Sequence, residues 1–289
     1  SAMSGGDEDT NTSIWTTVRI NKLLDEIENN GLDIKGLHNS PFKDNDINLK
    51  RAGLPFEYTP EEWEELRKCK EDIIYFAYNY CYIQTYDGVK LIKDTLGLRD
   101  FQEQILQTFD DNRLNILMAS RQIGKSVTSA IFILWFTLFN PEKTALIVAD
   151  NFVTTKELLD KLKISLEGLP FFMKPGIKLI NSGNIKFDTD SRIVARTTTK
   201  KSGIGLTVNL LYMDEFAHIH PNFIESFFRS TYPTVSSSKV SRIIITSTPN
   251  GQNKFWEIYQ GAMTGENTFN PIRVDWWQVP GREIGRAHV

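Results

Sequence analysis

Short apolar runs, separated by longer helical stretches, dominate the chain from Asn115 onward. Several runs are apolar at successive positions, which is typical of strands buried on both faces of a parallel sheet. The runs predicted to be strands are 115–118, 144–148, 193–195, 210–213 and 242–246. The stretches predicted to be helices are 126–139, 154–166 and 253–263. This alternation predicts an α/β fold, in which a mainly parallel sheet flanked by helices binds its ligand at the carboxyl ends of the strands.

The first part of the chain has a different pattern, in which helical periodicity and polar turns prevail. Apolar residues recur at close to helical spacing over 16–29. Thr59 stands before a proline and two glutamates, which is typical of a helix start with a hydroxyl cap and acids near the positive end of the helix dipole. We expect one helix from here through Tyr80. The first part is therefore predicted to be a smaller, mainly helical subdomain.

These patterns divide the chain into four predicted parts. We expect a disordered leader over 1–13, a helical or lid subdomain over 14–97, the sheet domain over 98–277, and a linker or tail over 278–289. Five aromatic residues within 75–82 are candidates for stacking on bases, but aromatic side chains on such a helix more often pack a core. We therefore interpret them as core residues.

Composition limits the classes of function that the chain can have. Of the 289 residues, 40% are hydrophobic and 24% are charged, as in an ordinary soluble globular protein. The net charge of −3 offers no general attraction for nucleic acid, so any DNA contact must be local or made by other parts. Two cysteines are too few for a disulfide framework or a zinc site. No apolar run is long enough to span a bilayer, so we expect no membrane partner.

The sharpest chemical signal is the segment Ala-Ser-Arg-Gln-Ile-Gly-Lys-Ser at 119–126, between a predicted strand and a predicted helix. In a phosphate loop, backbone N–H groups wrap the phosphates, a lysine such as Lys125 reaches the β and γ oxygens, and a hydroxyl such as that of Ser126 ligates Mg²⁺. Ala119 replaces the first glycine of the usual motif, and an ordinary helix cap is the alternative. The predicted nucleotide-binding residues are Ser120, Arg121, Gln122, Ile123, Gly124, Lys125 and Ser126.

Two adjacent carboxylates, Asp214 and Glu215, follow the predicted strand 210–213. Asp214 can hold Mg²⁺ through water, and Glu215 can orient and deprotonate an attacking water. A solvated turn would explain two acids taken alone. The order of strand, phosphate loop, helix and then a second strand ending in two acids favours a catalytic pair.

A third strand, 242–246, ends in the hydroxyl residues Thr246, Ser247 and Thr248. If this strand lies beside the one that carries the two acids, its hydroxyls lie near the γ-phosphate and can report the loss of that phosphate to the rest of the domain. The alternative is a polar strand end before a Pro-Asn-Gly turn.

Further side chains are candidates for nucleotide contacts. Phe101 can stack on adenine and Gln102 can hydrogen-bond its edge, although the start of a surface helix is a serious alternative. Arg121 can neutralise transition-state charge within its own subunit, or simply pair with a neighbouring acid. His218 and His220 are spaced as metal ligands, but no third ligand cluster accompanies them, so we assign no metal there.

Together these motifs resemble the large terminase subunit, the DNA-packaging ATPase of tailed bacteriophages, most closely the T4-like type. The resemblance runs over 98–277 and rests on four motifs in the order of that family: Gln102, 120–126, 212–215 and 246–251. It implies a RecA-like fold of the ASCE class of P-loop NTPases.

The resemblance also implies a function, with ATP and Mg²⁺ as cofactors. Lys125 and Ser126 would bind nucleotide and metal, Asp214 would hold the metal, Glu215 would be the catalytic carboxylate, and 246–248 would couple hydrolysis to motion. The motor would move double-stranded DNA, with the portal protein and the small terminase subunit as partners. It would work as a homo-oligomeric ring on the viral procapsid, in the cytoplasm of the infected bacterium.

Two departures from that family limit the resemblance. Many relatives place an arginine before a glycine ahead of the Asp-Glu strand, whereas Ile204 precedes Gly205 here and only Lys200 and Lys201 are close. A trans-acting arginine is therefore not assigned. Relatives also carry a C-terminal nuclease, and we expect this chain to hold the ATPase domain alone.

Two other classes of protein share some of these motifs. A superfamily 2 helicase would need a second RecA-like domain, and the stretch after Gly251 is too short to supply one. A nucleotide-binding switch or scaffold that does not hydrolyse ATP would not need Glu215, so the presence of this residue favours the enzyme.

Overall fold

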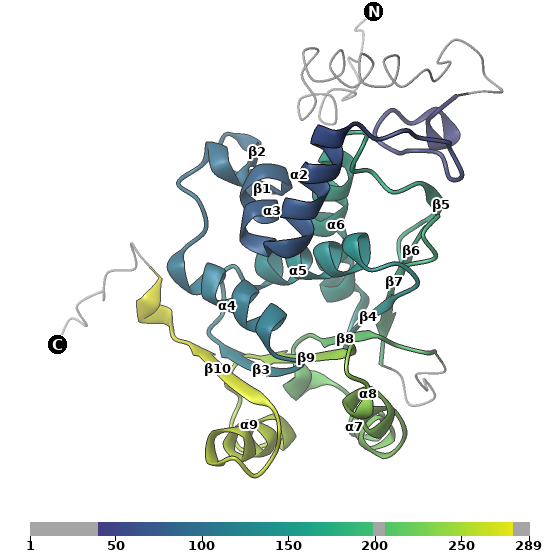
Figure 1. Ribbon diagram of the computed structural model, residues 1–289. Helices are drawn as coiled ribbons and strands as arrows, with labels where there is room; N and C mark the ends of the chain where they lie inside the picture. The colour runs from purple at the N-terminus through teal and green to yellow at the C-terminus, as the bar shows by residue number, and fades with distance from the viewer. Residues whose placement is uncertain (1–39, 199–205, 280–289) are drawn as a thin grey trace, which may run out of the picture.

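The computed structural model describes residues 40–198 and 206–279, which form a mixed sheet covered by helices on both faces (Figure 1). The leader 1–13, the helix predicted over 16–29 and nearly all of the tail 278–289 lie outside these residues. The strands of the main sheet are β3 (Leu114–Ala119), β4 (Thr144–Ala149), β5 (Ile177–Ile180), β6 (Asn184–Phe187), β7 (Arg192–Thr197), β8 (Leu210–Met213), β9 (Arg242–Ser247) and β10 (Asn270–Val274).

The strand order in this sheet is β10-β3-β9-β8-β4-β7-β6-β5. All neighbours from β10 to β7 are parallel, and β6 and β5 continue the sheet as an antiparallel edge. The five predicted strands and the mainly parallel α/β class are confirmed. The predictions missed β5, β6 and β10, where the polar residues Lys178, Lys186 and Arg273 interrupt the apolar pattern.

The α-helices connect and cover the strands. They are α2 (Pro60–Glu71), α3 (Ile73–Tyr80), α4 (Asp100–Asp111), α5 (Lys125–Phe139), α6 (Phe152–Gly168), α7 (Pro221–Ser226), α8 (Tyr232–Ser237) and α9 (Lys254–Thr264). A π-helical turn, Phe227–Thr231, joins α7 to α8. Short 3₁₀ turns cover Lys43–Asn45, Ile92–Asp94, Phe216–His218 and Trp276–Gln278.

Side chains that alternate along the strands build two apolar clusters, one on each face of the sheet. Leu117 and Tyr212 belong to the cluster formed with α3 to α6. Ile116 and Met213 belong to the other, which α7, α8 and α9 cover (Figure 1). All four are buried, and each apolar side chain of this size contributes about 1.5–3 kcal/mol when it leaves water. This double burial explains why the central strands are apolar at successive positions.

The helix predicted through Tyr80 is wrong in one respect, because it is divided at Asp72. The capping box of Thr59 and Glu62 starts α2 as expected, but α2 ends at Glu71. Asp72 has extended backbone angles, and its carboxylate accepts hydrogen bonds from the first N–H groups of α3. An aspartate in this position offers the chain a cap instead of a continued helix.

The first part of the described chain contains strands as well as helices, so "mainly helical" is incomplete. A two-stranded antiparallel hairpin, β1 (Tyr82–Thr85) with β2 (Gly88–Leu91), follows α3. The aromatic residues of 75–82 pack as predicted: Phe76 and Tyr82 are buried, and the hydroxyl of Tyr80 donates to Glu65.

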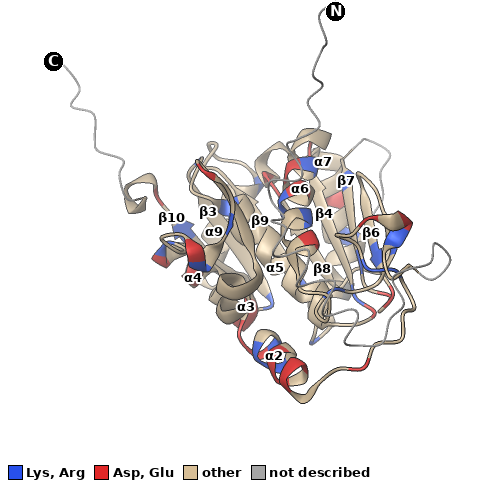
Figure 2. Ribbon diagram, turned by 90° about the horizontal axis from the view of Figure 1, so that it is seen from above, with Lys and Arg blue, Asp and Glu red and all other residues tan. Residues whose placement is uncertain are grey.

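Basic and acidic residues are interspersed over the ribbon (Figure 2). No helix among residues 40–198 and 206–279 is both long and apolar enough to cross a membrane.

Candidate functional site

The loop between β3 and α5 reverses direction through two left-handed residues. Gln122 has φ 59° and Gly124 has φ 84°. Ala119 is the last residue of β3, where it pairs with Val274 of β10. An extended strand residue needs no glycine, so the alanine that replaces the first glycine of the usual motif is compatible with the loop.

Gly124 is required for a second reason, because Gln102 lies against it. A Cβ atom added to Gly124 would lie 2.5 Å from the Gln102 Nε2 atom. Gln102 donates to the Gly124 carbonyl at 3.4 Å, and its Oε1 atom accepts from the Arg99 N–H at 2.9 Å. Gln102 is therefore fixed to the phosphate loop, while Phe101 is buried in the core beneath it. Neither lines the adjoining cavity, and their contact with adenine remains a prediction.

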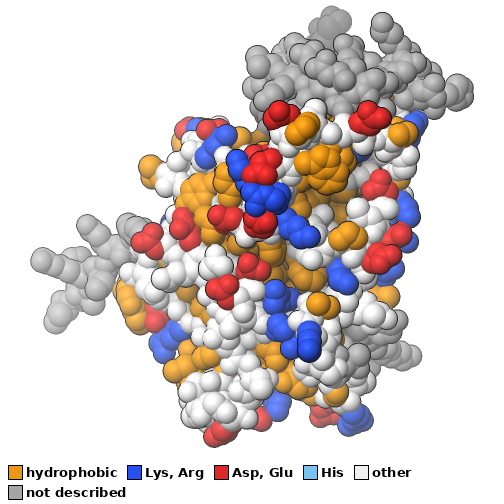
Figure 3. Space-filling model, in the orientation of Figure 1, with side chains coloured by type: hydrophobic (Ala, Val, Ile, Leu, Met, Phe, Trp, Pro, Cys, Tyr) orange, Lys and Arg blue, Asp and Glu red, His pale blue; other side chains and the backbone are white. Residues whose placement is uncertain are grey.

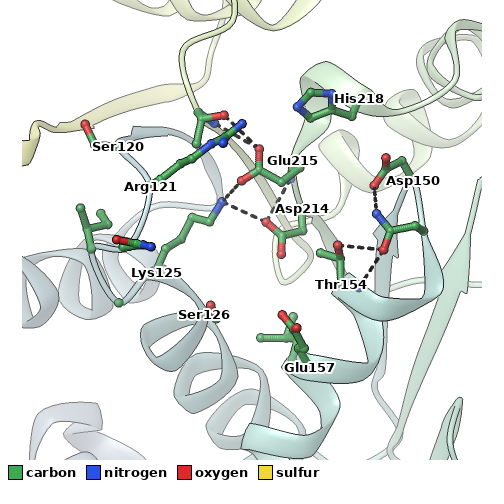
Figure 4. Close-up of a pocket in the computed structure, with 16 residues that line it drawn as sticks. Ser120, Arg121, Lys125, Ser126, Asp150, Thr154, Glu157, Asp214, Glu215 and His218 are labelled. Atoms are coloured by element: carbon green, nitrogen blue, oxygen red, sulfur yellow. Dashed lines mark hydrogen bonds and ion pairs between the residues drawn. The ribbon is translucent and has the colours of Figure 1, made fainter.

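Lys125, at the start of α5, lies between the two carboxylates that follow β8 (Figure 4). Its Nζ atom is 3.0 Å from Asp214 Oδ1 and 2.8 Å from Glu215 Oε1. Asp214 continues the line of β8, because its N–H donates to the Val148 carbonyl of the neighbouring strand at 2.8 Å. Glu215 then turns the chain with φ 48°, so the two adjacent acids approach the lysine from different directions.

The three hydroxyl residues at the end of β9 lie beside the carboxylates, as expected if the two strands are neighbours. The hydroxyl of Thr246 donates to Asp214 Oδ1 at 3.1 Å, and that of Thr248 donates to Glu215 Oε2 at 3.2 Å. Ser247 instead accepts from the Ala217 N–H at 3.3 Å. Each acid therefore has its own hydroxyl partner, Thr246 on β9 for Asp214 and Thr248 just after β9 for Glu215.

Charge pairing outweighs burial at this site. Burial disfavours the charge of Lys125, but Asp214 and Glu215 more than compensate, and the pKa of Lys125 is raised. Burial likewise disfavours the charge of Glu215, but Lys125 and the hydrogen bonds from Thr248 lower its pKa. Both side chains are therefore charged at neutral pH.

A cavity of about 480 Å³ opens over these residues. It is lined by all seven predicted loop residues, by Asp214, Glu215 and Thr248, and by six further residues that we did not predict to contact nucleotide: Asp150, Asn151, Thr154, Glu157, Leu158 and His218. Five of these lie in or just before α6, after the carboxyl end of β4. Because β4 pairs with β8, the rule that parallel strands end at one edge would have pointed to them.

Arg121 and the histidines have different places at the site. Arg121 is exposed in the loop and lines the cavity, extending in the direction of Glu215 in Figure 4. His220 caps α7, since its Nδ1 atom accepts from the Asn222 N–H at 3.1 Å. Among the described residues no group of three or more potential metal ligands of the His, Cys, Asp and Glu type occurs. The positions considered for a trans-acting arginine, 200–205, lie outside those residues.

The donor set suits Mg²⁺ bound together with a phosphate. Ser126 and Asp214 line the same cavity. Mg²⁺ is usually held by one or two protein oxygens, water and substrate phosphates, and seldom by a complete protein cage.

The chain matches the family model for the T4-type large terminase subunit, N-terminal part, over residues 116–277. Among solved structures it is similar to the large terminase of bacteriophage HK97, with 16% identity and a TM-score of 0.56 over 71% of this chain and 43% of that chain. It is also similar to the large terminase of a thermophilic bacteriophage in complex with ADP, with 14% identity and a TM-score of 0.51 over 64% and 47%. The chain thus spans less than half the length of either protein, and these likenesses support the RecA-like fold.

Proposed function

The chain belongs to the T4-type large terminase family, and from this premise we propose that it is an ATPase motor domain that hydrolyses ATP to move double-stranded DNA into a procapsid. The observation that carries the proposal is the contact of Lys125 with both Asp214 and Glu215 beside the phosphate loop. A loop that only bound nucleotide would not need a second carboxylate at the lysine.

In this proposal each side chain has a role that its surroundings support. Lys125 and the loop N–H groups bind the phosphates. Ser126 and Asp214 hold Mg²⁺, which supplies charge neutralisation on the phosphates when it is bound. Glu215, ionised and oriented by Thr248, accepts a proton from the attacking water. Arg121, which lines the same cavity, would neutralise developing charge from within the same subunit.

The contacts between β8 and β9 suggest how hydrolysis is coupled to motion. Thr246 and Thr248 bind the two catalytic carboxylates and belong to a buried central strand and the turn that directly follows it. If either carboxylate moves when the γ-phosphate is lost, it would therefore displace its threonine and with it the end of β9. Double-stranded DNA, the portal protein, the small terminase subunit and a ring of identical subunits are the partners proposed from membership of the family. The procapsid in the host cytoplasm is the proposed location.

ATP turnover of Glu215→Gln tests the catalytic assignment. We expect turnover to fall at least about 100-fold, because the amide cannot accept the proton. Binding of a fluorescent ATP analogue should change little, since Lys125 and the loop remain. Glu225→Gln, on the exposed surface of α7, is the matched control and should hydrolyse ATP at the wild-type rate. Unchanged hydrolysis by Glu215→Gln would favour a nucleotide-binding switch.

A further inference from the structure

A second cavity, of about 500 Å³, lies at the other end of α5. The helix starts at Lys125 in the phosphate loop, and its last residues, Leu138 and Phe139, line the second cavity. At 1.5 Å per residue, its 15 residues separate the two sites by about 22 Å. The remaining walls come from the segment 50–58, from α2, and from the loops 172–176 and 188–189.

Lys50 places a buried cation in this cavity. The residue is only 5% exposed, and its Nζ atom lies 4.6 Å from the ring centroid of Phe56 and 5.1 Å from that of Phe171. Among the described residues, no carboxylate forms an ion pair with it. Burial lowers the pKa of Lys50, and Asp188 and Glu62 offset only part of that effect.

Asp188 is already engaged by the backbone and is not a dedicated partner for Lys50. Its Oδ1 atom accepts from the Gly176 N–H at 3.1 Å and its Oδ2 atom from the Gly53 N–H at 3.2 Å. A buried ammonium without a carboxylate partner is costly, which is the expected condition of a side chain that meets its counter-ion in a complex.

A row of aromatic rings leads from Lys50 to the surface. Phe56 lies 4.8 Å from Tyr58, and Tyr58 lies 4.7 Å from Trp63, measured between ring centroids. Trp63 is 58% exposed, so its ring brings the row to the surface. Figure 3 shows apolar side chains beside basic and acidic ones on the face that carries α2.

The charges on α2 decide between an acidic peptide and a nucleic acid. This helix carries five glutamates against Arg67, Lys68 and Lys70, and Arg67 already pairs with Glu64 and Glu71. The charged residues that line the cavity itself are Lys50, Arg67, Lys70 and Lys174 against Asp188, so the cavity favours an anion. The five glutamates of α2 beside it disfavour the continuous line of phosphates on a nucleic acid. A single carboxylate with an apolar neighbour meets no such barrier.

We propose that this cavity, which we call the Lys50 pocket, binds a partner protein through a segment in which a large apolar residue stands next to one acidic residue. The carboxylate pairs with Lys50, and the apolar side chain packs against Tyr58 and Trp63. Aromatic rings supply most of the contact area at low entropic cost, while the buried charge pair selects the ligand. The proposal does not depend on the ATPase function.

Calorimetric titration of the whole chain with a defined probe tests this inference. The probe is the peptide acetyl-Gly-Phe-Glu-Leu-Gly-amide, and the peptide with Gln in place of Glu is its neutral control. We expect saturable binding of the acidic peptide and at least about tenfold weaker binding of the neutral one, because a charged hydrogen bond is lost. Lys50→Met should weaken the acidic peptide to the level of the neutral one, and Lys93→Met, an exposed lysine outside the pocket, should not.

Trp63→Ala is a second variant for this test, to be used if Lys50→Met does not fold. Because Trp63 is exposed, its replacement should leave folding intact. It should weaken the acidic peptide about threefold through lost aromatic contact and leave the urea midpoint unchanged. Equal binding of the two peptides, no saturation at millimolar peptide, or indifference to both substitutions would overturn the proposal. A DNA duplex whose binding requires Lys50 would instead assign the pocket to nucleic acid. Peptide binding seen only after removal of 1–39 would assign it to this chain's own N-terminal segment.

Discussion

A lysine that is largely withdrawn from water lies at each end of α5, and the two lysines have opposite electrostatic surroundings. Lys125 contacts two carboxylates and has a raised pKa. Lys50 contacts two aromatic rings and has a lowered pKa. Burial disfavours the charge in both cases, so the partner decides the direction of the shift. Carboxylates of the described chain balance the charge of Lys125. The charge of Lys50 faces aromatic rings and can pair with an anion from a partner.

Replacing each lysine with methionine is the strongest way to break this comparison. Lys125→Met leaves the buried Asp214 beside the half-buried Glu215 without their cation, so we expect a loss of about 3 kcal/mol in the free energy of unfolding. ATP turnover should fall at least about 100-fold. Urea unfolding without nucleotide and a phosphate-release assay measure the two effects.

Lys50→Met is the matched control for the stability effect. Methionine keeps the unbranched apolar stem between Phe56 and Phe171 and removes only the buried charge, so the free energy of unfolding should stay the same or rise. A larger loss of stability in Lys50→Met than in Lys125→Met would contradict the assignment of the two environments.

Gly124→Ala sharpens the description of the phosphate-loop end of α5. We expect a loss of about 2 kcal/mol, since the alanine would adopt φ 84° and its Cβ would lie 2.5 Å from Gln102 Nε2. Gly251→Ala is the control, because Gly251 also has a positive φ, 67°, but no atom within 4 Å of the added Cβ. Adding Gln102→Ala to Gly124→Ala should restore the part of the lost stability that comes from the clash between the new Cβ and Gln102. The part that comes from the strained backbone should remain lost. A double-mutant cycle in urea that shows no coupling would exclude that contact.

Thr248→Val tests whether the hydroxyl orients Glu215. Valine lacks the hydroxyl that donates the 3.2 Å hydrogen bond to Glu215 Oε2. Loss of this bond should cost about 1 kcal/mol of stability and lower ATP turnover about tenfold. Thr248→Ser keeps the hydroxyl and should retain most of the activity, with nucleotide affinity unchanged in both variants. If serine and valine have the same effect on turnover, the role of Thr248 is packing.

The sequence predicted the phosphate-loop end of α5 far better than the other end. At the phosphate loop, buried strands and motif order locate Lys125, Asp214 and Thr246, because parallel strands bring their carboxyl ends to one edge. The same rule, applied to β4, would have added Glu157. The Lys50 pocket could not be predicted, since Lys50 lies in a turn-rich segment and meets Phe171 only through the tertiary fold.

The apolar pattern also failed at Asp72, where one continuous helix competes with a helix end followed by a new helix. The helical pattern continues from α2 into α3, but the carboxylate of Asp72 binds the N–H groups of Ile74 and Tyr75 and starts a new helix. An internal cap of this kind depends on the direction in which the chain turns, which the pattern of apolar residues does not encode.

The pH dependence of stability gives the smallest effect and separates the two lysines most directly. Because the folded pKa of Lys50 is lowered, the unfolded chain binds its proton more tightly, and the penalty for the buried charge is relieved as pH rises from the folded value toward about 10.4. Wild type should therefore gain stability relative to Lys50→Met as the pH rises from 7 to 10. The stability difference between wild type and Lys125→Met should stay constant in that interval. Because the pKa of Lys125 is raised, its charge stabilises the fold fully until the pH exceeds about 10.4. Because the pKa of Glu215 is lowered, its charge stabilises the fold fully until the pH falls below about 4.3. Urea midpoints at four pH values for the three proteins measure both differences, and parallel curves for the two variants would show that Lys50 and Lys125 share one kind of environment.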